Sequence, residues 1–96
     1  MARKASGEWA GKDPDAKKDY SVDWTNMLQE GETIVSSTWS ASPEGLTLYD
    51  GSVSEGRATT WISGGSAGTT YEVTNHIITS RGMEDDYTEP LDVAEE

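Results

Sequence analysis

Few side chains in this sequence have the types and spacing that catalysis needs. His76 is the only histidine, and it falls at a polar position of an alternating segment, where we expect it to face water. The run Gly65-Ser66-Ala67-Gly68 lacks the spacing and the flanking residues of a nucleophile elbow. No glycine-rich phosphate-binding motif is present, and a chain without cysteine has no thiolate nucleophile or thiolate metal ligand. We therefore expect no enzymatic activity, no catalytic residue and no cofactor.

Acidic side chains are the best candidates for binding a hard cation such as calcium. They gather in the runs Glu84-Asp85-Asp86 and Glu95-Glu96, but the spacing of an EF-hand loop is absent. The pair Asp50-Gly51 is typical of a turn. We interpret both runs as solvated surface and predict no metal site; a calcium-dependent module is the less favoured alternative.

The four tryptophans could either pack in the core or form a sugar-binding surface. Trp24, Trp39 and Trp61 lie inside predicted strands, which favours burial in a core. Two coplanar exposed rings would instead indicate the sugar-stacking platform of a carbohydrate-binding module. Trp9 lies in a polar segment with no local core to join, so we expect it to insert into a groove on a neighbouring chain.

Length and composition limit what can position these side chains. Ninety-six residues are enough for one small domain with a tail, and an apolar share of 33% without phenylalanine predicts a thin core. No apolar run approaches the roughly 18 residues of a membrane helix, and no apolar leader is apparent, which predicts neither membrane insertion nor secretion. A net charge of −11 makes nucleic acid an improbable partner.

The charge divides the chain into two parts. Residues 1–18 hold five basic against three acidic residues, a net +2, whereas residues 19–96 hold two basic against fifteen acidic residues, a net −13. The first part is polar and rich in turn residues, so we predict an extended arm over residues 1–18 that is disordered on its own. Because opposite charges guide docking, we expect the arm to bind acidic neighbours through Arg3, Lys4, Trp9, Lys12, Lys17 and Lys18.

Residues 19–94 are predicted to form an all-β domain. Segments rich in Thr, Val, Ile, Trp and Tyr alternate with clusters of Gly, Pro, Asp and Ser, which fits a small sandwich of six or seven strands. Ile34 and Val35 are adjacent apolar residues, which a β-bulge would explain. Pro90 lacks an N–H and places the last strand at an edge or a bulge. The expected strands cover residues 19–24, 33–41, 46–49, 58–63, 70–80 and 87–93.

Several segments, taken together, resemble one family of phage proteins. The resemblance covers roughly residues 12–93 and resides in Lys12-Asp13-Pro14-Asp15, Asp19-Tyr20-Ser21-Val22-Asp23-Trp24, Gly31-Glu32-Thr33-Ile34, Pro43-Glu44-Gly45-Leu46-Thr47, and the segment of residues 61–75 that begins Trp61-Ile62-Ser63-Gly64-Gly65. The chain is similar to small structural proteins of tailed bacteriophages that are described as fibre–tail adaptors or head–tail region virion proteins. Glu89-Pro90 departs from the apolar last strand that this resemblance leads us to expect.

The resemblance implies an immunoglobulin-like sandwich and a function exerted by contact rather than catalysis. It implies a virion component, assembled in the host cytoplasm, whose partners are connector, tail or fibre proteins and which is present in multiple copies in a symmetric ring. A capsid decoration protein is the alternative within this class. A carbohydrate-binding attachment module is the alternative from a different class.

Overall fold

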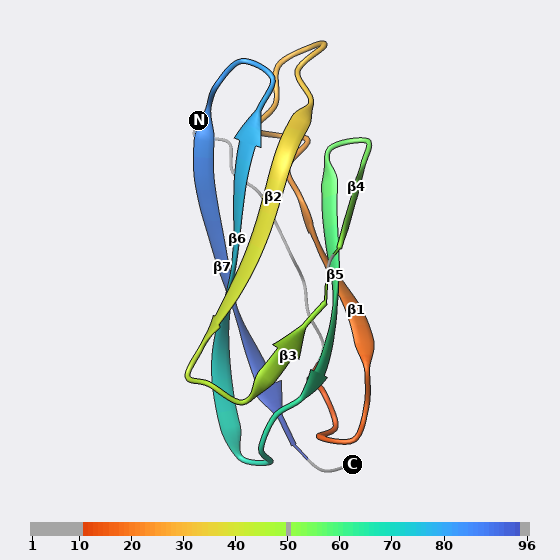
Figure 1. Cartoon of the computed structure of the whole chain (residues 1–96), viewed down its shortest axis with the longest axis vertical. Helices are drawn as coiled ribbons and strands as arrows, with labels where there is room; N and C mark the ends of the chain where they lie inside the picture. Colours follow the sequence, from red (N-terminus) through yellow and green to blue (C-terminus); the bar gives the residue numbers. More distant parts are fainter. Residues whose placement is uncertain (1–10, 50, 95–96) are drawn as a thin grey trace.

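The computed structural model describes residues 11–49 and 51–94, which form seven β-strands in two sheets (Figure 1). One sheet has the order β1-β5-β3, with β4 also paired to β5, and the other has the order β2-β6-β7. Neighbouring strands in both sheets are antiparallel. The strands are β1 (Lys18–Asp23), β2 (Ile34–Ser42), β3 (Leu46–Leu48), β4 (Ser52–Ser54), β5 (Arg57–Gly64), β6 (Thr69–Thr79) and β7 (Glu84–Val93).

The alternation of apolar and polar residues determines which side of each strand faces the core. In β1, Tyr20 and Val22 are buried, as is Trp24 just beyond the strand, because successive side chains point to opposite faces of a sheet. In β6, the odd-numbered residues from Tyr71 to Thr79 are buried, which confirms the predicted facing of that strand. The two inward faces pack together as a sandwich.

A β-bulge resolves the ambiguous facing of β2. Ile34 is paired with Thr79 and Ser36 with Ile78, so that Val35 is the additional residue in the register. Ile34 consequently lies in the core, while Val35 is 63% exposed. The bulge allowed by the sequence is therefore present.

The core consists of two hydrophobic clusters that share Trp39, and buried polar contacts tie the two sheets together. Trp39 is half-buried and packs against both clusters. Trp24, 1% exposed, donates from its indole Nε1 to Asn75 Oδ1 at 2.8 Å. Asn75 in turn donates to Ser37 Oγ at 2.9 Å and to the Thr38 carbonyl at 3.1 Å. The segment after β1 is thus tied to both β6 and β2 of the opposite sheet.

The structure differs from the sequence predictions in three places. Trp61 was expected in the core but is 45% exposed, because Ala58, Thr60 and Ile62 take the inward positions of β5. The short strand β4, whose three residues are all exposed, was not predicted. Strand β7 begins at Glu84, three residues earlier than expected.

Pro90 lies in an edge strand, as its missing N–H predicts. The backbone groups of Asp92 and Ala94 point away from β6, since Lys12 N–H donates to the Asp92 carbonyl and Ala94 N–H donates to the Lys12 carbonyl, both at 2.9 Å. Pro90 shares the parity of these two residues, so its lack of an N–H removes no bond to β6.

Candidate functional site

Three of the residues predicted to bind a partner, Lys12, Lys17 and Lys18, lie within the part of the chain that the structure describes. Arg3, Lys4 and Trp9 lie outside the described residues. Lys17 and Lys18 are both exposed, and the Lys17 ammonium lies 3.9 Å from the centroid of the Tyr49 ring. The structure therefore brings Lys17 onto the outer face of the sheet that contains β5, beside an aromatic residue.

Lys12 has a different environment from the one predicted. Its residue is 1% exposed, and its ammonium donates to the carbonyl oxygens of Gly64 at 2.6 Å and Asp13 at 2.8 Å. Desolvation lowers the pKa of this lysine, while the carboxylate of Asp13 opposes the shift. Lys12 was expected to meet an acidic neighbour, but here it holds the chain against the ends of β5 and β7.

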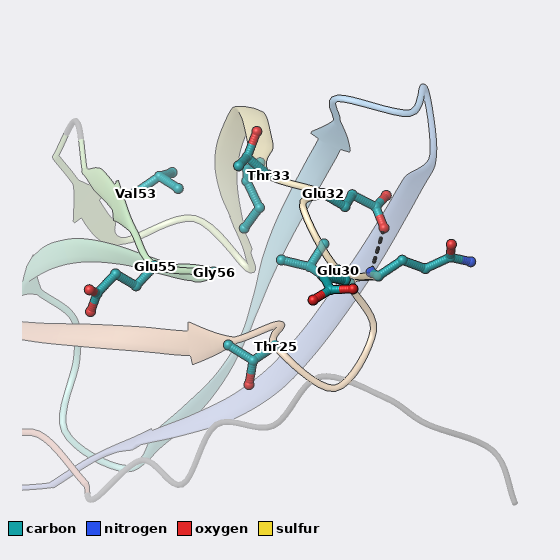
Figure 2. A pocket seen from close by; sticks show the side chains of 10 residues that line it. Thr25, Glu30, Glu32, Thr33, Val53, Glu55 and Gly56 are labelled. Carbon is teal, nitrogen blue, oxygen red and sulfur yellow. Dashed lines mark hydrogen bonds between the residues drawn. The ribbon is translucent and has the colours of Figure 1, made fainter.

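A cleft of about 480 Å³ opens at the opposite end of the sandwich (Figure 2). Its walls come from the loop that joins β1 to β2 and from the β4–β5 hairpin. We call it the end cleft; its lining residues are Thr25, Leu28, Gln29, Glu30, Glu32, Thr33, Ile34, Val53, Glu55 and Gly56. The lining includes three glutamates, of which Glu30 and Glu55 are exposed, and no Lys or Arg. It also includes the apolar residues Leu28, Ile34 and Val53.

The hairpin turn at Glu55 and Gly56 shapes one wall of the end cleft. Both residues have positive φ angles, 53° and 80°, which suit a two-residue turn between antiparallel strands. A Cβ at Gly56 would lie 2.8 Å from Thr25 Cγ2 and 3.2 Å from Leu28 Cδ1. Glycine therefore allows the hairpin to approach the loop after β1 closely.

Glu32 fixes the loop that forms the other wall. Its side chain is fully buried, Gln29 N–H donates to Oε1 at 2.8 Å, and the Thr79 hydroxyl donates to Oε2. Arg81 contributes a more distant charge, with Nη1 3.7 Å from Oε1. The pKa of Glu32 is held below its ordinary value, first by the Thr79 hydrogen bond and then by Gln29. The dashed line at Glu32 in Figure 2 marks the hydrogen bond that its carboxylate accepts from the Gln29 N–H. Glu30 and Glu55 come from different walls of the cleft.

His76 lies on the outer face of β6, on the side predicted to face water. Its Nδ1 contacts Asp86 Oδ1, and its Nε2 lies 3.2 Å from Glu84 Oε1. The hydrogen bond to Asp86 is the first cause of a raised pKa, which partial desolvation opposes. Two members of the acidic run at residues 84–86 thus hold an imidazole. Within residues 11–49 and 51–94, no three His, Asp or Glu side chains are grouped so as to hold a metal ion.

Two exposed aromatic residues lie on the outer face of the β1-β5-β3 sheet. Trp61 is 45% exposed and Tyr49 is 39% exposed, and Tyr49 N–H donates to the Trp61 carbonyl at 2.9 Å. Lys17 occupies one side of the Tyr49 ring. Sequence parity did not reveal this pair, because Trp61 was assigned to the core.

The end cleft could not be found from local sequence motifs. It joins residues 25–34 with residues 53–56, and only the folded register brings these segments together. The one available signal was Gly56, because glycine suits the positive φ angles of a hairpin turn. Among the described residues, no helix is long and apolar enough to cross a membrane.

The two-sheet architecture places the chain among immunoglobulin-like β-sandwiches. It is similar to the solution structure of the PKD domain from KIAA 1837 protein, with a TM-score of 0.62, 21% identity, and coverage of 100% of this chain and 90% of that chain. The comparison with curated proteins finds no match. The family model described as podophage GP4 fiber-tail adaptor protein gp77 matches residues 12–91. The chain belongs to this family of phage fibre–tail adaptors, which confirms the resemblance.

Proposed function

We propose that this protein is a non-enzymatic structural component of a phage virion, located in the head–tail or tail–fibre region. The observation that carries the proposal is the family match over residues 12–91, nearly the whole of the described sandwich. An adaptor of this kind works by contact, and its partners are connector, tail or fibre proteins. It is assembled into the particle in the host cytoplasm.

We further propose that the N-terminal arm makes contacts between neighbouring subunits arranged as several copies in a symmetric ring. Arg3, Lys4 and Trp9 supply charge and apolar surface for these contacts. Lys17 and Lys18, at the end of the same arm, are exposed. Lys12 has another role in this arrangement. Its ammonium is buried and donates to the Gly64 carbonyl, which anchors the arm to the sandwich at residue 12. The support for assembly by charge is the acidic character of residues 19–96.

Removal of the gene from a phage, followed by electron microscopy of the particles, tests the adaptor function. An adaptor's loss gives tailless or fibreless particles, and complementation with the intact chain restores them. Particles with normal tails and fibres but a bare capsid surface would overturn the adaptor proposal and favour capsid decoration.

Deletion of residues 1–10 tests the arm separately, because it leaves Lys12 and its hydrogen bonds in place. We expect a full-length oligomer in light scattering and a folded monomer after deletion, with unchanged far-ultraviolet circular dichroism. An oligomer of unchanged mass after deletion would refute the proposed contact through the arm.

A further inference from the structure

Lys12 and the end cleft lie at opposite ends of the sandwich. Lys12 is bound beside Val93 and Gly64, where β7 and β5 end, whereas the residues that line the cleft include those at or next to the starts of β2 and β5. Figure 1 shows these strand ends and strand starts at opposite ends of the sandwich. The β6–β7 register runs from the Ile78–Glu84 pair at the cleft end to the Thr69–Val93 pair at the other end. Nine residue steps at about 3.3 Å each separate the two ends by roughly 30 Å.

The end cleft has the chemistry to accept a basic side chain. Glu30 and Glu55 are exposed, Glu32 lies behind them, and no Lys or Arg lines the space. The apolar lining suits the aliphatic stem of a lysine or arginine, whose charged end can meet the carboxylates. A volume of about 480 Å³ falls within the range of roughly 300–1,000 Å³ that is usual for binding pockets.

We propose that the end cleft of one copy binds Arg3 and Lys4 of a second copy, so that subunits associate head to tail. The inference rests on the proposed contact between the arm and neighbouring copies, and it names the surface that receives the arm. A head-to-tail interface repeats from copy to copy and closes into a ring where the rotation allows. The basic segment Arg3-Lys4 is charge-complementary to Glu30 and Glu55, the two exposed glutamates of the cleft.

Chain length favours a second copy over the arm's own sandwich. Arg3 and Lys12 are nine residue steps apart, and these steps span at most about 30 Å when fully extended. A flexible segment of that length has a root-mean-square span of about 15–18 Å, which is well short of the cleft on the same molecule. A neighbour whose cleft faces the Lys12 end requires only a short span.

Charge reversal in the full-length chain tests the pairing. The variant Glu30→Lys/Glu55→Lys reverses the rim of the cleft, and Arg3→Glu/Lys4→Glu reverses the arm. We expect each to weaken self-association about tenfold or more in sedimentation at low salt, because it places like charges together. Asp19→Lys/Glu72→Lys is the matched control: it makes the same charge change at two exposed positions away from the cleft, and it should leave association unchanged.

Mixing the two reversed proteins separates an intermolecular contact from an intramolecular one. The basic arm of the cleft variant matches the acidic cleft of the arm variant, and the acidic arm of the arm variant matches the basic cleft of the cleft variant. The mixture should therefore associate although neither protein does so alone. A mixture that stays monomeric, or a wild-type chain that is monomeric, overturns the inference. If the arm reversal dissociates the oligomer and the cleft reversal does not, the arm contact stands and the end cleft is not its receptor. Circular dichroism of each variant checks that the fold is retained.

Discussion

The hydrogen bond between Trp24 and Asn75 provides a quantitative test of what holds the two sheets together. Asn75 is fully buried, accepts from the Trp24 indole at 2.8 Å and donates to Ser37 and Thr38 of β2. The substitution Asn75→Leu keeps the number and branching of the side-chain heavy atoms but leaves the indole N–H of Trp24 and the Thr38 carbonyl without this partner. Each unsatisfied buried group costs about 1–3 kcal/mol, so we expect a loss of about 2–4 kcal/mol in the free energy of unfolding.

Such a loss is large for a chain of this size. Ninety-six residues correspond to a total stability of about 5–14 kcal/mol at the usual values per residue. At about 4–8 °C for each kcal/mol, the melting temperature should fall by at least about 8 °C. Urea denaturation followed by tryptophan fluorescence measures the change. Asn26→Leu is the matched control, since Asn26 is exposed in the turn after β1 and should change stability little.

A double-mutant cycle identifies the pair as the cause. Trp24→Phe removes the donor, so the combination with Asn75→Leu no longer leaves an indole N–H unsatisfied, and it should be less destabilised than the sum of the two single variants. Strictly additive losses, or a loss below about 0.5 kcal/mol for Asn75→Leu, would refute the argument that this buried bond links the sheets.

Four further outcomes follow from particular residues. Gly56→Ala should destabilise the chain by about 1–2 kcal/mol in urea unfolding, because φ is +80° and the new Cβ meets the loop after β1. The lowered pKa of Glu32 contributes stability above about pH 4.3 that is lost as the pH falls through the lowered value, and Glu32→Gln should flatten this acid-side loss. The raised pKa of His76 contributes stability that is complete below about pH 6.5 and lost as the pH rises through the raised value, a dependence that His76→Gln should abolish. Iodide should quench Trp61 and leave Trp24 protected, so that Trp61→Phe removes much of the quenched emission.

The strands were predictable where a single physical pattern dominates. In β6, inward and outward residues alternate over eleven positions, and the predicted segment at residues 70–80 differs from Thr69–Thr79 by one residue at each end. In β5, Trp61 was assigned to the core from its large apolar side chain, whereas the alternation of Ala58, Thr60 and Ile62 on the inward face puts it outward. The alternation of residues along a strand therefore predicts burial better than side-chain size does when the two disagree.

The environment of Lys12 could not be derived from its sequence neighbours. A lysine among polar residues is ordinarily solvated, and its burial here depends on the carbonyl of Gly64, fifty-two positions away. The end cleft likewise joins residues that are far apart in the sequence, since its glutamates come from separate segments. Local patterns determine which way a strand faces, whereas sites built from loop ends depend on the register of the whole sandwich.

Buried polar contacts hold the sandwich together in its interior and fix the backbone at each of its two ends. Asn75 connects the sheets in the interior, Glu32 fixes the loop at one end, and Lys12 fixes the chain at the other. Both end contacts use buried charged groups to hold backbone in place, and such groups are costly to leave unpaired. Each end can therefore present its exposed side chains on a defined backbone, which reduces the conformational entropy lost on docking. Contacts at either end can then form without rearrangement of the sandwich between them.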